Sequence, residues 1–173
     1  MEESGVENGG GHLALMPSCM SSWVDNGSVE SHRYYLARRT ILEMLKDRGY
    51  DAPDSDLNLS LHEFRSIFSE HPDLERLRIS LPLLSNPSKK IIVIFCGTDK
   101  VKLGVIRGIR GQIANDTSLT RLILILQSEM TSQAKQDLSL FQVDVEIFQG
   151  TLFLVNLAKR YASLWFFNSI GSA

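Results

Sequence analysis

Residues 91–96 read Ile-Ile-Val-Ile-Phe-Cys, and they decide the fold together with residues 122–126, which read Leu-Ile-Leu-Ile-Leu. Each run is too short for a helical core and too continuously apolar for a strand with one face in water. Both runs therefore predict strands that are covered on both faces. An alternating run at Val143, Val145 and Ile147 predicts a third strand.

Two helical patterns separate the three predicted strands. Their apolar residues recur at helical spacing: Val105, Ile106, Ile109 and Ile113 in the first pattern, and Ala134, Leu138 and Phe141 in the second. An order of strand, helix, strand, helix, strand is typical of parallel βαβ units with right-handed crossovers. We therefore predict an α/β fold with a βαβαβ-type sheet and helices packed on it.

Two further helices are predicted before the sheet. The first has apolar residues at helical spacing from Tyr34 to Leu45, and Gly49 marks its end. The second begins with a capping box, in which Ser60 and Glu63 each satisfy a backbone N–H group. Its expected buried stripe is Leu61, Phe64, Ile67 and Phe68.

A shorter alternating stretch follows the second helix. Leu77, Ile79 and Leu81 alternate with polar residues, as in a half-buried strand. Proline lacks the N–H group that the interior of a sheet requires. We therefore expect Pro82 and Pro87 to break the chain after this strand.

The composition is that of an ordinary soluble domain. The chain has 173 residues, with 20 acidic residues against 18 Lys and Arg, and it is 43% hydrophobic. These values exclude wholesale disorder, collagen and coiled coils, and no apolar run reaches the ~18 residues that a membrane helix needs. Acidic residues stand near the N-terminus where a signal peptide carries Lys or Arg. We therefore expect an intracellular protein with Cys19 and Cys96 reduced.

Three segments differ in composition. Residues 1–30 hold five acidic residues and no Lys or Arg, and the frequent Gly and Ser there predict a flexible extension over residues 1–29. Residues 30–149 contain the predicted helices and strands. Residues 150–173 are apolar and rich in aromatic residues, with helical spacing. This last segment either packs on the domain as a final helix or forms an exposed apolar tail.

No residue pattern in the sequence predicts catalysis or a metal site. His62-Glu63 has Ser66 where a zinc protease motif has its second His. The sequence lacks Glu-x-Lys and Asp-x-Lys, the patterns with which metal-dependent nucleases hold a metal and polarise water. Asp144 and Glu146 share a face of the third strand without such a Lys, and we interpret them as charges that keep a sheet edge soluble. We expect no catalytic residue, no metal and no cofactor.

Glycines after the first apolar run do not form a nucleotide motif. Gly97-Thr98-Asp99-Lys100 matches neither the dinucleotide fingerprint nor the phosphate loop of nucleotide hydrolases. Gly104, Gly108 and Gly111 fall within the next helical pattern, where each costs ~1 kcal/mol relative to Ala. We interpret these three as a sign that the helix approaches the sheet closely.

The segment from residue 87 to residue 121 is basic. Against two acidic residues it holds seven cationic ones: Lys89, Lys90, Lys100, Lys102, Arg107, Arg110 and Arg121. A cluster of this kind can follow a phosphate backbone. The alternative is a solvated helix face and loop, because no aromatic residues alternate with the cations to stack on bases.

Several stretches resemble one protein family. Residues 35–40 read Tyr-Leu-Ala-Arg-Arg-Thr, residues 44–50 read Met-Leu-Lys-Asp-Arg-Gly-Tyr, and residues 122–136 continue from the second apolar run into Gln-Ser-Glu-Met-Thr-Ser-Gln-Ala-Lys-Gln. With residues 61–64 and 93–95, they are similar to the N-terminal jaw domain of the fifth-largest subunit of eukaryotic nuclear RNA polymerases. The similarity covers about residues 30–149. It is greatest to the plant variant associated with RNA polymerase V, the enzyme of RNA-directed DNA methylation.

This resemblance implies a non-catalytic subunit in the nucleus, whose jaw domain lies beside downstream duplex DNA. Its implied partners are the largest subunit and the other core subunits of a nuclear RNA polymerase. The resemblance implies no membrane, no cofactor and no small-molecule substrate, since the chemistry resides in the two largest subunits.

The resemblance also implies where DNA is contacted. The family's turn after the second apolar strand reads Met-Thr-Pro-Ser-Ala-Lys and faces the DNA, whereas residues 130–135 read Met-Thr-Ser-Gln-Ala-Lys here. Ser132 thus replaces the proline, while Thr131 and Lys135 match. The expected DNA contacts are therefore Thr131, Ser132 and Lys135 from this turn, together with Lys100, Lys102 and Arg107 from the basic segment. A structural alternative is that Thr131 or Ser132 caps the following helix.

The family continues beyond this jaw domain into a second domain that anchors the subunit to the largest one. Residues 150–173 do not resemble that domain. We therefore expect either an alternative transcript, giving a truncated isoform, or a truncated gene model, with a divergent tail in place of that domain. A second hypothesis is a free protein-interaction module of the transcription machinery, and DNA affinity that falls steeply with salt would argue against it.

Overall fold

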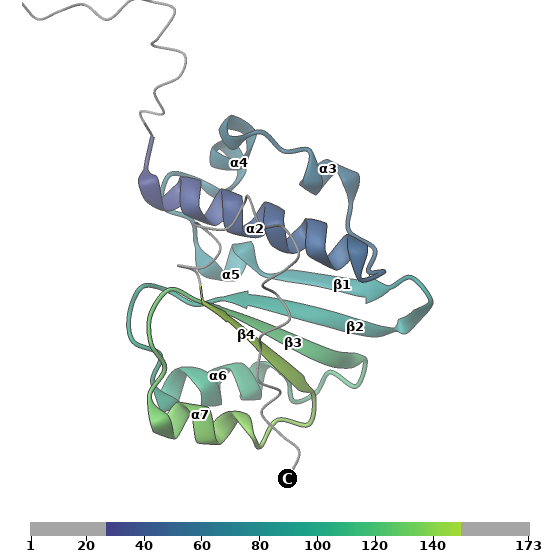
Figure 1. Cartoon of the computed structure of the whole chain (residues 1–173), viewed down its shortest axis with the longest axis vertical. Helices are drawn as coiled ribbons and strands as arrows, with labels where there is room; N and C mark the ends of the chain where they lie inside the picture. The colour runs from purple at the N-terminus through teal and green to yellow at the C-terminus, as the bar shows by residue number, and fades with distance from the viewer. Residues whose placement is uncertain (1–26, 150–173) are drawn as a thin grey trace, which may run out of the picture.

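Figure 1 shows the computed structural model of the chain, which describes residues 27–149. Its helices and strands, in chain order, are α2 (Val29–Asp47), α3 (Asp54–Leu57), α4 (Leu61–Phe68), α5 (Leu74–Leu77), β1 (Ile79–Leu83), β2 (Asn86–Phe95), α6 (Leu103–Ile113), β3 (Leu119–Leu126), α7 (Ser132–Leu138) and β4 (Asp144–Gln149). α2 and α4 lie on one side of the sheet and α6 and α7 on the other, so the fold has three layers (Figure 1). The expectations for residues 1–26 and 150–173 lie outside the described residues.

The predicted α/β architecture is confirmed. The four strands form one sheet in the order β1-β2-β3-β4. β2 pairs with β3 and β3 pairs with β4, both in parallel, with α6 and α7 in the two crossovers. Among residues 27–149, no helix combines the length and the apolar character that a membrane crossing requires.

The first strand of the sheet differs from the prediction. Pro82 does not end the strand, because it lies within β1 opposite Lys90, and Pro87 lies within β2. β1 is antiparallel to β2, so the sheet is mixed. Edge strands tolerate proline, and the pairing register shifts directly after Pro82. Leu77 was also predicted to lie in this strand, but it is the last residue of α5.

Successive side chains of β2 and β3 point to opposite faces of the sheet and supply two separate cores. On one face, Ile91, Val93 and Ile123 join the core beneath α2 and α4. On the other face, Leu122 and Leu124 join the core beneath α6 and α7. The prediction that both strands are covered on both faces is therefore confirmed.

Local signals set the end of α2 and the start of α4 where the sequence places them. Ser60 and Glu63 form the predicted capping box. Gly49 has a φ of 84°, and the N–H groups of Gly49 and Tyr50 donate to carbonyl groups in the last turn of α2. This arrangement is a Schellman motif, which favours glycine at its left-handed position.

Two exposed apolar residues contradict the predicted helical stripes. Ile67 of α4 is 45% exposed, and Val105 of α6 is 47% exposed. In α4 only Phe64 and Phe68 are buried, because this helix contacts the core through one narrow side. The buried residues of α6 are Ile106, Ile109 and Ile113. The helical period therefore identified the correct faces but overestimated their width.

β4 is an edge strand that the helices cover only in part. Val145 and Ile147 are half-buried against the core of α6 and α7, while Phe148 is buried in the core of α2. Apolar residues therefore lie on both faces of this strand, where the sequence predicted simple alternation.

The glycines of α6 do not mark a close approach to the sheet. A Cβ atom added to Gly104, Gly108 or Gly111 would meet no atom of the described residues within 4 Å. The interpretation from the sequence is wrong because these glycines face away from the core that Ile106 and Ile109 enter.

Alanine substitutions should separate the two kinds of glycine in this fold. Gly108→Ala should stabilise the protein by up to about 1 kcal/mol, because α6 gains helix propensity and the methyl group would meet no atom of residues 27–149 within 4 Å. Gly49→Ala should destabilise the protein by about 1–2 kcal/mol, because alanine is strained at positive φ. Urea unfolding followed by circular dichroism measures both changes. A Gly108→Ala protein less stable than the wild type would contradict the open face of α6.

Cys96 should react slowly with alkylating reagents in the folded protein. The residue is 6% exposed, and burial raises the pKa of its thiol to about 11 because the thiolate loses its hydration. In a Cys19→Ser variant at pH 8, iodoacetamide should modify the folded protein at least about tenfold more slowly than the urea-unfolded protein. Mass spectrometry measures both rates, and equal rates would show that the thiol is accessible.

Candidate nucleic-acid interface

The loops that follow β2 and β3 lie side by side at the carboxyl ends of these strands. Val101 and Met130 form an isolated parallel bridge between the loops. The N–H group of Val101 donates to the carbonyl of Glu129 at 3.0 Å, and the N–H group of Thr131 donates to the carbonyl of Val101 at 3.0 Å. We call residues 97–102 and 127–135, which include the first turn of α7, the carboxyl edge.

Helices α6 and α7 both begin at the carboxyl edge. Lys102 is the N-cap residue of α6 and makes no side-chain cap hydrogen bond. Thr131 is the N-cap residue of α7, and its hydroxyl accepts a hydrogen bond from the Ala134 N–H group at 3.3 Å. The structural alternative from the sequence therefore holds for Thr131, while Ser132 is the exposed first residue of α7.

The six expected DNA contacts fall in one region of the molecule. Lys100 and Lys102 stand on the first loop of the carboxyl edge, beside Thr131 and Ser132 on the second. The other two residues, Arg107 and Lys135, follow about one turn farther along α6 and α7. The crossover topology thus brings together cations that are about 30 residues apart in the sequence.

The cations of this region differ in their partners. Lys100 Nζ lies 4.0 Å from Glu129 Oε2, and both side chains are largely exposed. Lys102 and Lys135 are exposed, and among the described residues neither forms an ion pair with a carboxylate. Two positive charges of the region are therefore available to an anion without breaking an ion pair between described residues.

A buried carboxylate joins the two helices behind the carboxyl edge. Asp137 of α7 has a side chain that is 7% exposed, and its Oδ2 lies 3.1 Å from Arg110 Nη1 of α6. Its Oδ1 lies 3.8 Å from Arg107 Nε, whose side chain remains 62% exposed. Asp137 therefore links α7 to α6 while Arg107 still reaches the solvent.

Lys90 and Arg121 of the basic segment lie elsewhere. Lys90 is bound to Asp116 at 2.6 Å, at the opposite end of the apolar run of β2. This lysine and the Ser118 hydroxyl lower the pKa of Asp116. Arg121 lies 3.9 Å from Asp144 and 3.8 Å from Glu146. The basic segment is therefore not one continuous surface, and only part of it reaches the carboxyl edge.

Asp144 and Glu146 lie on β4, at the edge of the sheet, and both are ion-paired. Glu146 accepts hydrogen bonds at 2.9 and 3.0 Å from Arg48 at the end of α2, in addition to its contact with Arg121. Within residues 27–149, no three His, Cys, Asp or Glu residues come together in a group that could hold a metal ion.

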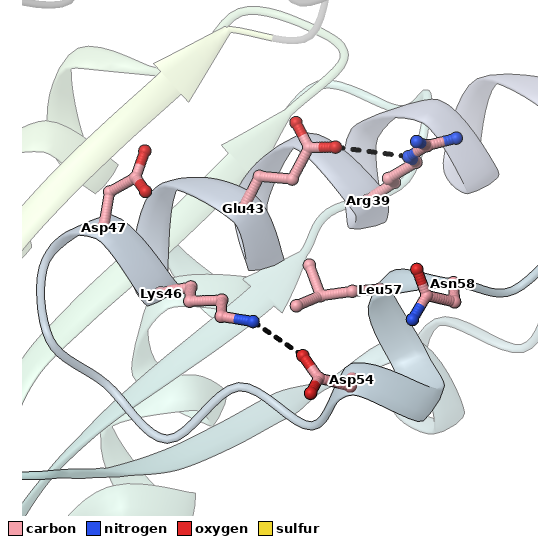
Figure 2. A pocket seen from close by; sticks show the side chains of 7 residues that line it. All are labelled: Arg39, Glu43, Lys46, Asp47, Asp54, Leu57 and Asn58. Atoms are coloured by element: carbon pink, nitrogen blue, oxygen red, sulfur yellow. Dashed lines mark hydrogen bonds and ion pairs between the residues drawn. The ribbon is translucent and has the colours of Figure 1, made fainter.

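A hollow of about 310 Å³ lies between α2 and α3, away from the carboxyl edge. Figure 2 shows its lining residues: Arg39, Glu43, Lys46, Asp47, Asp54, Leu57 and Asn58. Arg39 pairs with Glu43 at 3.2 Å, and Lys46 pairs with Asp54 at 2.6 Å, which lowers the pKa of Asp54. These four charged side chains neutralise one another in two ion pairs, so they do not indicate which kind of ligand the hollow could bind.

Sequence reasoning missed Glu129 and Asp137, the acidic residues that pair with cations of this region. Each is separated from its cationic partner by 27 residues or more, across a strand and a loop. No local pattern connects such residues. The parallel pairing of β2 with β3 places their following loops and helices side by side. Only this pairing would have suggested which acidic residue lies near which cation.

Comparison with known proteins supports the resemblance. Residues 28–113 match the family described as RNA polymerase Rpb5, N-terminal domain. The chain is 50% identical over 142 residues to DNA-directed RNA polymerase V subunit 5A of Arabidopsis thaliana. The aligned residues cover 82% of this chain and 64% of that protein. It is 50% identical over 137 residues to DNA-directed RNA polymerases IV and V subunit 5B of the same plant, covering 79% of this chain and 63% of that protein.

A third relative extends this comparison. DNA-directed RNA polymerase V subunit 5C of Arabidopsis thaliana is 47% identical over 143 residues, covering 83% of this chain and 61% of that protein. The chain thus spans somewhat less than two thirds of the length of these three relatives. The family match includes the first loop of the carboxyl edge and ends before the second. Through residues 28–113, the chain belongs to the family of the RNA polymerase Rpb5 N-terminal domain.

Proposed function

We propose that this protein is a non-catalytic subunit of a nuclear DNA-directed RNA polymerase. In this proposal residues 30–149 form a jaw domain whose carboxyl edge contacts downstream duplex DNA. One observation carries the DNA contact: the bridge between Val101 and Met130 places Lys100 and Lys102 beside the turn that leads to Lys135. The identity of about 50% to subunits of RNA polymerases IV and V supports the assignment to such an enzyme.

The chemistry of the carboxyl edge fits contacts with the phosphate backbone. Lys102 and Lys135 are exposed cations, and Ser132 offers an exposed hydroxyl. Ammonium and hydroxyl groups bind phosphate oxygens without reading sequence. Residues 97–102 and 127–135 include no aromatic side chain on which a base could stack. The proposed contact is therefore electrostatic and independent of DNA sequence.

The proposed partners are the largest subunit and the other core subunits of the polymerase, and the proposed compartment is the nucleus. The names of the relatives support RNA polymerase V. The role proposed with it, in RNA-directed DNA methylation, is the one that the family resemblance implies. The chain supplies no catalytic group in this proposal, because the polymerisation chemistry belongs to other subunits. Its contribution is to hold and guide the duplex.

Charge removal at the carboxyl edge should weaken DNA binding. Lys102→Ala and Lys135→Ala should each lower the affinity of the full chain for a labelled 30-base-pair duplex. Each should also reduce the slope of log affinity against log salt concentration by about 0.9, because one phosphate contact is lost. Fluorescence anisotropy between 25 and 150 mM NaCl measures both quantities.

Lys46→Ala is the matched control for this experiment. Lys46 is 53% exposed and pairs with Asp54 in the hollow between α2 and α3, so the substitution removes the same charge far from the carboxyl edge. The control should leave the salt slope unchanged. An equal loss in all three variants would show that net charge, and not the carboxyl edge, governs binding.

Incorporation into a polymerase is tested in cells. The tagged full chain, expressed in Arabidopsis thaliana and purified from nuclei, should bring down the two largest polymerase subunits in near-equal amounts. Mass spectrometry identifies which polymerase they belong to. If both subunits are absent, the chain acts as a free protein-interaction module and the subunit proposal fails.

A further inference from the structure

We propose that Glu129 weakens DNA binding at the carboxyl edge by competing with DNA phosphate for Lys100. This inference rests on the proposed function, because it concerns the same surface. It assigns to one acidic residue the regulation of how tightly the jaw holds the duplex.

The backbone fixes Glu129 at the surface that would face DNA. Its carbonyl accepts the Val101 N–H group at 3.0 Å, within the bridge that joins the two loops. Its side chain is 83% exposed and lies one residue before Met130, whose own side chain is buried. The carboxylate therefore stands in solvent at the centre of the carboxyl edge and not in a core.

Glu129 lies close enough to Lys100 to act as an internal anion. Its Oε2 is 4.0 Å from Lys100 Nζ, and the Lys100 side chain is 57% exposed. An exposed ion pair at this distance is weak and exchanges readily with other anions. A phosphate that binds Lys100 must replace the carboxylate or accept its repulsion. Either event lowers the affinity for DNA.

Asp137 has a different role, although it also pairs with cations of this region. Its side chain is 7% exposed and is held between α6 and α7 by Arg110 at 3.1 Å. A carboxylate in that position does not meet an incoming phosphate, and its removal would disturb the packing of the helices. Of the two carboxylates that pair with cations of this region, Glu129 is therefore the one that acts on binding without acting on the fold.

Weak attachment suits the function proposed for the jaw. A duplex that moves past a polymerase must exchange its phosphate contacts at every step. Lys102 and Lys135 supply attraction, and Glu129 limits the attraction at the adjacent Lys100. Attraction by the two lysines, limited by Glu129, gives a lower affinity for DNA. Affinity differences within one interface appear mainly in the dissociation rate, so the contacts break quickly.

Glu129→Gln should tighten binding of the full chain to the 30-base-pair duplex by about two- to fivefold at 50 mM NaCl. The salt slope should steepen by up to about 0.9, because Lys100 gains a phosphate contact. In a Lys100→Ala background the same substitution should have a smaller effect, since the competition is gone. Thermal unfolding should not change, because Glu129 is exposed.

Asp144→Asn is the matched control. Asp144 is 80% exposed and lies 3.9 Å from Arg121, so it resembles Glu129 in exposure and pairing. It lies at the start of β4, at the opposite end of the sheet from the carboxyl edge. This substitution adds the same charge to the molecule and should change the affinity much less.

The outcomes separate the inference from the proposed function. If Lys102→Ala and Lys135→Ala weaken binding while Glu129→Gln and Asp144→Asn behave alike, Glu129 does not compete for Lys100 and the inference fails alone. If the lysine substitutions leave DNA binding unchanged, the proposed DNA contact fails and the inference fails with it. An undiminished effect of Glu129→Gln in the Lys100→Ala background also overturns the competition.

Discussion

The parallel pairing of β2 with β3 is the constraint on which the rest of this structure depends. Parallel strands need a crossover connection, and here α6 provides it. A parallel sheet must also be covered on both faces, because its strands are apolar throughout. α2 and α4 cover one face and α6 and α7 cover the other, which accounts for the three layers and the two cores. The antiparallel β1 and the half-covered β4 are the two edge strands of the sheet.

The same pairing creates the carboxyl edge. β2 and β3 run in one direction, so the loops that leave them emerge together, and the bridge between Val101 and Met130 continues their pairing beyond the strands. Charges that are far apart in the sequence become neighbours for this reason. A surface made in this way inherits the rigidity of the sheet, because its backbone hydrogen bonds extend those of the strands.

The sequence predicted those features that depend on strong or local patterns. The apolar runs at residues 91–96 and 122–126 allow only strands with two covered faces, and the capping box at Ser60 is a local hydrogen-bonding pattern. The misassigned features depend on tertiary context. Pro82 is compatible with a strand because β1 is an edge, and Ile67 is exposed because no element between residues 27 and 149 covers that side of α4. A helical or alternating period cannot contain this information.

The cations of the interface were accessible to sequence reasoning because a basic segment and a family resemblance both point to them. Their acidic partners were not, since an ion pair across a crossover leaves no trace in either local segment. The position of a carboxylate in the fold then decides its effect. Asp137 is buried between two helices and holds them together, whereas Glu129 is exposed beside Lys100 and opposes other anions. In our proposal, two residues of the same charge, eight positions apart, therefore act on stability in one case and on binding in the other.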